Sequence, residues 1–318
     1  MTDRRAALAT LRALVALPRH AQRAALDAFR ATLHDPPTPE AWNTAFGPGS
    51  LYAAWAKTPW MQRLYLANRD AVHAALARAR ARHGAAGWTA LEVGGGDGSL
   101  WREALRDDDV GTLYVVDPHP DPAERIRSIA AAAAPQVRVV ALQKRLEVAS
   151  LPSADVAVAS LVLHHIAGRD ASARQAVGLE GPGKLEALVA LRAALAPNGG
   201  RLVVNEADVH CDIELAPGDA LLADRLIDSY VRRCAMLLAD AIEREPADAD
   251  LRDRWWTILR RWCLDQVDQA DVVIEDRDVY ELDTPRWEAL LRDAGFRVLR
   301  RQFTDEAGLF AQILATPA

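Results

Sequence analysis

The sequence has little of what would place this chain in a membrane, in a secreted disulfide-rich class or among zinc proteins. No apolar run approaches the ~18 residues of a membrane span, so we expect no membrane partner. The first residues lack the apolar core and small-residue cleavage site of a signal peptide, and we therefore expect a cytoplasmic protein. The three cysteines (Cys211, Cys234, Cys263) are odd in number and widely spaced, which argues against a disulfide framework or a cysteine-rich zinc site.

An excess of basic residues is also missing. The chain has 38 Lys and Arg against 44 Asp and Glu, for a formal net charge of −6. Because nucleic-acid phosphates are bound mainly by basic patches, we expect no nucleic-acid partner. Of the 318 residues, 50% are hydrophobic. A chain of this length can bury a substantial core, in one large α/β domain plus a smaller helical part.

The stretch from Trp88 to Asp117 organises the rest of the chain. An apolar run ends at Val93 and is followed by glycines, which indicates a buried strand and a tight turn. A helical pattern begins at Ser99, and a second apolar run over 113–116 ends on the carboxylate of Asp117. These features predict a strand–helix–strand unit with a glycine-rich first turn.

The chemistry of that turn favours an adenosyl ligand. Glycines allow positive φ and let the backbone approach a ligand closely. The start of the following helix offers free N–H groups to an anionic group. Asp117 follows Gly98 by about 20 residues, the offset at which an acid binds ribose hydroxyls. A dinucleotide motif would need a third glycine where Ser99 stands.

The motif Glu92-x-Gly94-x-Gly96-x-Gly98, with Asp117 beyond it, resembles the first motif of class I, Rossmann-like S-adenosylmethionine-dependent methyltransferases. The segments LPSADVAVASLVLHHI and LRAALAPNGGRLVVNEAD resemble the fourth and fifth strands of the small-molecule members of that family. The resemblance covers residues 87–208 and 282–318. It implies an α/β fold with a doubly wound, mostly parallel seven-stranded sheet. It also implies S-adenosylmethionine as cofactor and S-adenosylhomocysteine as product.

The expected elements and domains follow from this reading. We predict further strands over 137–142, 155–160 and 201–205, and an antiparallel last strand over 309–315. Residues 1–86 form a helical cap or dimerisation region, and its last helix begins at Thr58-Pro59 and runs to about Arg82. Residues 87–318 form the methyltransferase domain, with a helical lid insertion at about 209–280. The N-terminal helices are the candidate surface for a homodimer.

Residue roles implied by the resemblance centre on the cofactor. Glu92 and the three glycines would surround its methionine portion, and Asp117 would bind the ribose hydroxyls. Asp97 has two readings: it holds the cofactor's ammonium group, or it caps the following helix. The remaining cofactor-binding candidates are Pro118, His119, Arg145, Leu146 and Ser160.

The candidate residues that would bind or deprotonate the methyl acceptor are mainly histidines and aromatic residues. Imidazole titrates near neutral pH, so His165, and after it His164, are the candidate general bases; alternatively, the pair only shapes the pocket. Tyr52, Trp55, Trp60, Tyr65 and Glu206 are the candidate substrate-binding residues. For the aromatic residues, packing between cap helices is the alternative reading.

The predicted function is methyl transfer to O, N or C of a small, partly apolar metabolite, with secondary metabolism as its expected setting. One alternative is metal-assisted C-methylation of a 2-oxo acid, with ligands drawn from the histidine pair and residues 205–212. Another is a cofactor-binding protein that catalyses nothing and acts as a structural or regulatory partner. Ser160-Leu161-Val162-Leu163 stands where methyltransferases of nucleic-acid bases carry an Asn/Asp-Pro-Pro-aromatic tetrapeptide.

Overall fold

The structure is a computed structural model of the chain. It describes residues 54–146, 149–166, 182–208, 246–258, 282–305 and 308–318, and single residues at 13, 17, 18, 21, 24, 25, 242 and 244. Within these residues, no helix has both the length and the hydropathy needed to cross a membrane.

Contacts divide the chain into two compact units, each built from two segments. The first comprises Met1–Gln62 and Val209–Arg277, and the second comprises Arg63–Asp208 and Asp278–Ala318. The predicted domain boundaries at residues 86, 209 and 280 remain predictions.

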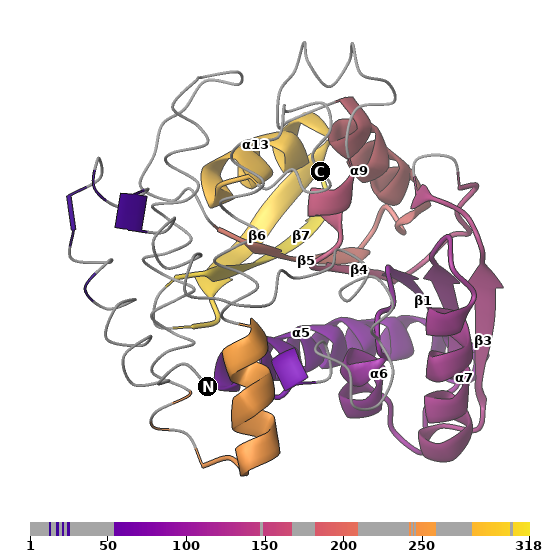
Figure 1. Ribbon diagram of the computed structural model, residues 1–318. Coiled ribbons are helices and arrows are strands. Elements are labelled where there is room, and N and C mark those ends of the chain that lie inside the picture. Colours follow the sequence, from indigo (N-terminus) through magenta and orange to yellow (C-terminus); the bar gives the residue numbers. More distant parts are fainter. Residues whose placement is uncertain are drawn as a thin grey trace. The chain divides into compact units, whose positions relative to one another are not determined.

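A seven-stranded sheet with the order β3-β2-β1-β4-β5-β7-β6 forms the centre of the second unit (Figure 1). The first five strands in the chain pair in parallel, whereas β7 runs antiparallel to both β5 and β6. The predicted doubly wound, mostly parallel sheet is therefore confirmed. The strands are β1 (Trp88–Val93), β2 (Gly111–Val116), β3 (Val137–Leu142), β4 (Val156–Ser160), β5 (Arg201–Ala207), β6 (Phe296–Phe303) and β7 (Phe310–Pro317).

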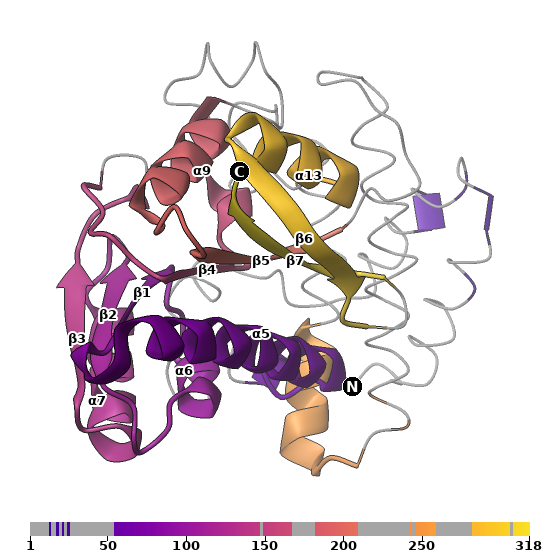
Figure 2. The ribbon, with the colours of Figure 1, turned by 180° about the vertical axis from the view of Figure 1, so that it is seen from behind.

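Helices cover both faces of this sheet, as Figures 1 and 2 show. One face carries α5 (Pro59–His83), α6 (Ser99–Ala104) and α7 (Asp121–Ala133). The other face carries α9 (Pro182–Ala194) and α13 (Thr284–Asp293). The predicted long helix that starts at a proline is confirmed by the bounds of α5. The predicted strand–helix–strand unit is likewise confirmed by β1, α6 and β2.

The core under α5, α6 and α7 shows which strand residues face these helices, and therefore which residues at the strand ends lie on the same face. Its buried members include Ala90 of β1, Val115 of β2, Val158 of β4 and Val203 of β5. Successive side chains of a strand point to opposite faces, so positions two residues further on return to the same face. Those positions hold polar groups at the carboxyl ends of the four strands: Glu92, Asp117, Ser160 and Asn205.

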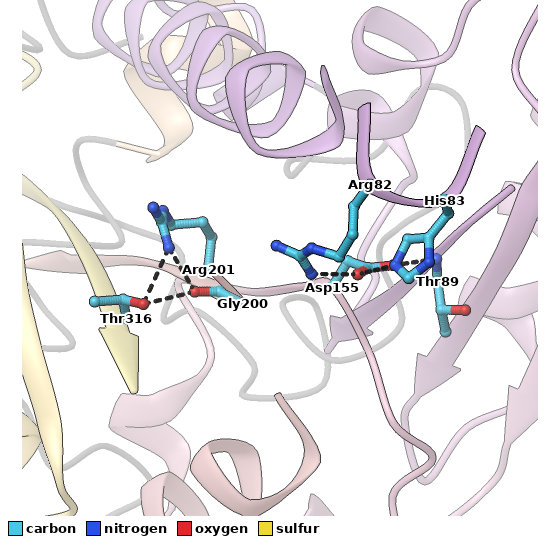
Figure 3. Close-up of polar contacts among 7 residues, drawn as sticks. All are labelled: Arg82, His83, Thr89, Asp155, Gly200, Arg201 and Thr316. Carbon is cyan, nitrogen blue, oxygen red and sulfur yellow. Dashed lines mark hydrogen bonds and ion pairs between the residues drawn. The ribbon is translucent and has the colours of Figure 1, made fainter. Parts of the chain in front are cut away.

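At the amino ends of β1 and β4, the buried carboxylate of Asp155 contacts several neighbouring groups (Figure 3). Its Oδ1 accepts from Arg82 Nη1 at 3.1 Å and lies 2.8 Å from His83 Nε2, both at the end of α5. Its Oδ2 accepts from the backbone N–H of Thr89 at 3.0 Å. One side chain thus joins the end of α5 to the beginnings of β1 and β4.

The described part of the first unit contains a cluster of tryptophans. Residues 249–258 are helical, within the predicted insertion. Trp255 is buried, and its Nε1 donates to the carbonyl of Ala54 at 2.9 Å. The rings of Trp55 and Trp60 pack edge to face, with their centroids 5.7 Å apart.

Candidate active site

The turn between β1 and α6 has the backbone conformation expected of its glycines. Gly94, Gly96 and Gly98 have φ of 69°, 51° and 77°, in the region that side chains disfavour. A Cβ at Gly94 would lie 2.5 Å from Val162 Cγ2, and one at Gly98 would lie 2.7 Å from Ile129 Cδ1. Packing within the protein therefore requires these two glycines, in addition to any approach of a ligand to the backbone.

Asp97, in the same turn, caps the start of α6. Its Oδ1 accepts from the backbone N–H of Ser99 at 2.9 Å, and its Oδ2 accepts from the Ser99 hydroxyl at 2.5 Å. This is the capping alternative foreseen from the sequence. A contact between Asp97 and the ammonium group of a cofactor remains a prediction.

Glu92 is a buried acid at the carboxyl end of β1. It is 4% exposed, and Oε2 accepts from Trp101 Nε1 at 2.9 Å. Burial raises the pKa of Glu92 to about 8; the bond from Trp101 opposes this rise, and the negative charge of Asp117 adds to it. Without a positive partner, the Glu92 carboxyl is therefore largely protonated at neutral pH.

Asp117 lies one residue past the end of β2. Its Oδ1 accepts from the backbone N–H of His119 at 2.8 Å. Partial burial raises the pKa of Asp117, and the bond from His119 together with the charges of His119 and Arg125 opposes the rise. Pro118 and His119 themselves are exposed. Two carboxyl groups with raised pKa values thus lie near each other at the ends of β1 and β2.

Ser160, at the end of β4, belongs to a buried polar row that the sequence did not suggest. Its hydroxyl accepts from Asn68 Nδ2 of α5 at 3.2 Å. Asn68 Oδ1 in turn accepts from Gln312 Nε2 of β7 at 2.8 Å. Asn205 pairs with both Ser160 and Gln312 across the sheet and is fully buried, yet its side-chain nitrogen and oxygen have no hydrogen-bond partner among the described residues.

His164 and Glu206 form a histidine–carboxylate pair after β4 and near the end of β5. His164 Nδ1 lies 2.6 Å from Glu206 Oε2, and the two side chains are 13% and 2% exposed. Glu206 Oε1 accepts from the backbone N–H groups of Leu163 at 2.7 Å and Val162 at 3.2 Å. The His165 ring lies 4.2 Å from that of His164, centroid to centroid. Both oxygens of Glu206 therefore bind groups of this chain.

A strained residue introduces this histidine pair. Leu161 has φ of 52°, which makes it the only residue other than glycine with positive φ in the described chain. Its backbone N–H donates to the carbonyl of Asn205 at 2.8 Å. Such strain persists only where surrounding contacts enforce it, and it is common at functional sites. Here it turns the chain so that the short helix Leu163–His165 lies beside Glu206.

The other predicted site residues differ in their exposure to solvent. Leu146 is buried and Arg145 is exposed. Trp55, Trp60 and Tyr65 are all buried, at 5%, 4% and 8% exposure. Tyr52 lies outside the described residues. Contact of these aromatics with an acceptor remains a prediction.

The ligands proposed for the metal-dependent alternative are only partly described. Asp208 Oδ2 accepts from the backbone N–H of Thr284 at 3.2 Å and from its hydroxyl. His210, Cys211 and Asp212 lie outside the described residues. Among those described, no group of three or more His, Cys, Asp or Glu is arranged to hold a metal ion.

Comparison with protein families identifies the class of this domain. Residues 91–201 match the family model described as a methyltransferase domain, and they include the glycine turn, Asp117 and His164. Together with the sheet order above, this match confirms the predicted methyltransferase domain of the class I, Rossmann-like type. No curated protein matches the chain significantly.

Several solved methyltransferase structures are distantly similar to the chain. An O-methyltransferase family protein from Burkholderia thailandensis is 16% identical, with 81% of this chain and 57% of that one covered and a TM-score of 0.45. The magnesium protoporphyrin IX methyltransferase of Synechocystis is 13% identical, with 88% and 94% covered and a TM-score of 0.46. The N,N-8-amino-8-demethyl-D-riboflavin dimethyltransferase of Streptomyces davawensis is 14% identical, with 98% and 69% covered and a TM-score of 0.42.

Some of these structures belong to considerably longer chains. This chain spans 57%, 59% and 50% of the length of three of the methyltransferases first matched.

Proposed function

We propose that this protein transfers the methyl group of S-adenosylmethionine to an O–H or N–H group of a small, partly apolar metabolite. The observation that supports the proposal is the set of polar residues at the carboxyl ends of four neighbouring strands. Glu92, Asp117 and the glycine turn lie at the ends of β1 and β2, and the His164–Glu206 pair lies at the ends of β4 and β5. In open α/β sheets, ligands bind outside the carboxyl ends of the strands.

The residues at β1 and β2 suit the proposed cofactor in charge and in hydrogen bonding. S-adenosylmethionine carries a sulfonium, an ammonium group and a ribose diol. Glu92 and Asp117 each have a raised pKa, so a nearby cation would favour their ionised forms. Asp117 would accept hydrogen bonds from the ribose hydroxyls, while the turn at Gly96 would lie along the methionine portion. When bound, the cofactor supplies a methyl group already activated for displacement.

His164 is the group that we propose to remove the acceptor's proton. With Glu206 at its Nδ1, the imidazole carries a proton there and presents Nε2 as the base. A carboxylate in this position fixes the ring and stabilises the imidazolium that forms when the proton is taken. The sequence favours His165 as the base, whereas the contact between His164 and Glu206 supports His164 in this role.

Glu206 then has an orienting role and does not bind substrate. Three bonds from this chain already use its two oxygens: those from the backbone of Val162 and Leu163, and that of His164. Its low exposure of 2% agrees with this role. The acceptor would meet the imidazole, and the carboxylate would remain behind it.

The test is a labelling experiment with the whole protein. The purified chain is incubated with S-adenosylmethionine labelled in its methyl group and with a small-molecule extract, and the label is followed by chromatography. We expect label in a small molecule for the wild type and its loss in His164→Ala. Cofactor binding without any labelled product would favour the non-catalytic alternative. Transfer that is equally fast in His164→Ala would exclude the proposed base.

A further inference from the structure

A pocket of about 300 Å³ lies between α5 and the β6–β7 hairpin, entirely within the second unit. It lies on the amino side of β5, where Arg201 begins the strand, whereas Glu206 is near the other end of the same strand. Its volume is at the lower end of the range typical of small-ligand sites. The lining residues are Asp70, Ala71, Ala74, Ala75, Arg78, Arg201, Leu299, Arg300 and Leu314.

The charge around this pocket is predominantly positive. Among the described residues, no carboxylate lies within ion-pair distance of Arg78, Arg201 or Arg300. Asp70, the acid in the lining, has its Oδ1 at 2.8 Å from Arg69 Nη2. Burial lowers the pKa of Arg201, and the nearby positive charges of Arg78, Arg297 and Arg82 lower it further. An anion in the pocket would relieve this repulsion.

Two of the arginines are each held in place by hydrogen bonds from one guanidinium nitrogen. Arg201 Nη1 donates to the carbonyl of Gly200 and to the hydroxyl of Thr316, both at 3.0 Å (Figure 3). Arg300 Nη2 donates at 3.2 Å to Gln312, which is itself bound to Asn68 of α5. A guanidinium has five N–H donors in a fixed plane, so each side chain is oriented and retains donors for a ligand.

The remaining walls are small and apolar. Alanines 71, 74 and 75 of α5 face Leu314 of β7, and short side chains leave the space that the pocket occupies. Leu299 lies at a register shift between Val298 and Arg300 and is 38% exposed. A bulge of this kind re-aims the side chains of its strand, and here the residues around it line the pocket.

We propose that this pocket binds a small organic anion with an apolar body. Its carboxylate would accept hydrogen bonds from Arg78, Arg201 and Arg300, and its hydrocarbon part would lie against the alanines and leucines. This site is separate from the methyl-transfer site, and its existence does not depend on the proposed activity.

Calorimetric or NMR titration of the full-length protein tests the proposal with a matched set of probes. Hexanoate carries the required charge and apolar chain, while hexanol and hexylammonium keep the chain and change the head group. We expect saturable binding of hexanoate and binding at least about tenfold weaker for the two controls. Equal binding of hexanol and hexanoate, or no binding of hexanoate, would overturn the proposal.

Three variants locate the binding. Arg78→Gln removes a charge whose side chain has no hydrogen bond or ion pair among the described residues, so the fold should not change, and we expect about tenfold weaker hexanoate binding. Ala74→Leu fills the pocket from an exposed helix position and should block binding with every charge kept. Arg138→Gln, an exposed control on β3 at the far edge of the sheet, should bind as the wild type does. Unchanged affinity in both pocket variants would contradict the proposal.

Discussion

Oε2 of Glu206 lies 2.6 Å from Nδ1 of His164, and the other oxygen of the same carboxylate accepts two backbone N–H groups of the loop that carries the histidine. The carboxylate therefore fixes both the ring and the segment from which it projects. In the role proposed for His164, the ring would carry its proton on Nδ1, beside Glu206, and take up the acceptor's proton at Nε2.

Removal of the His164 imidazole should abolish most of the turnover without weakening the binding of the cofactor. For His164→Ala we expect kcat to fall by a factor of ~10²–10⁴, the usual contribution of a general base. Glu206→Gln should lower kcat as well, because an amide cannot stabilise the imidazolium as a carboxylate does. Steady-state kinetics and calorimetric cofactor affinity check both variants. His165→Ala is the matched control, and a larger loss in that variant would return the role to His165.

Asp117→Ala should weaken cofactor binding. In the proposed site this side chain accepts hydrogen bonds from the ribose diol, and the loss of such a contact costs ~1–3 kcal/mol. Calorimetry with S-adenosylhomocysteine measures the change without turnover. Asp121→Ala, at the exposed start of α7, is the control. Wild-type affinity in Asp117→Ala would exclude the proposed ribose contact.

Glu92 should make the fold less stable as pH rises. Its pKa is about 8 in the folded chain against an ordinary value of 4.5. Between these values the folded state holds a proton that the unfolded state has lost, so the free energy of unfolding falls with increasing pH. The stabilising contribution is complete below about pH 4.5 and is lost as the pH rises through 8. Denaturant unfolding from pH 5 to 9 measures this decline.

Glu92→Gln separates stability from binding. Glutamine keeps an oxygen for the bond from Trp101 and does not ionise, so this variant should lose less stability than the wild type as the pH rises. Its cofactor affinity should nevertheless fall, because the negative charge is gone. A variant with the same pH dependence as the wild type would show that Glu92 is not the titrating group.

Asp155→Ala should destabilise the second unit without any direct effect on the site. The substitution leaves the N–H of Thr89 without its acceptor and removes the ion pair with Arg82. An unsatisfied buried donor costs ~1–3 kcal/mol, which denaturant unfolding would detect. Asp107→Ala, an exposed acid after α6, should change stability little. Equal stability of the two variants would remove the role given to Asp155.

The positions of β1 to β5 along the chain could be predicted from the sequence, because these strands are short apolar runs that end at a glycine, an acid or another polar residue. The contacts of Asn68 could not, because its partner Gln312 is 244 residues away and meets it only after β7 is inserted beside β5. The hydrogen bonds of Glu206 could not be predicted for a similar reason: they depend on how the loop after β4 turns at Leu161.

The glycine motif was predicted correctly in conformation and incompletely in cause. Positive φ at Gly94 and Gly98 follows from the motif. A Cβ at these positions would also meet Val162 or Ile129. This restriction depends on how the loop after β4 and α7 pack against the turn, which the sequence around the motif does not reveal. Likewise, the capping role of Asp97 was one of two readings, and only the fold placed both of its oxygens on Ser99.

Titration calorimetry with S-adenosylmethionine near pH 7, in two buffers of different ionisation enthalpy, measures both cofactor binding and the protons released on binding. We expect one bound molecule per chain and release of up to about one proton, since the cation should ionise Glu92. The same proton release should be absent in Glu92→Gln. Absence of binding, or binding of a nicotinamide dinucleotide in place of S-adenosylmethionine, would contradict the proposed function.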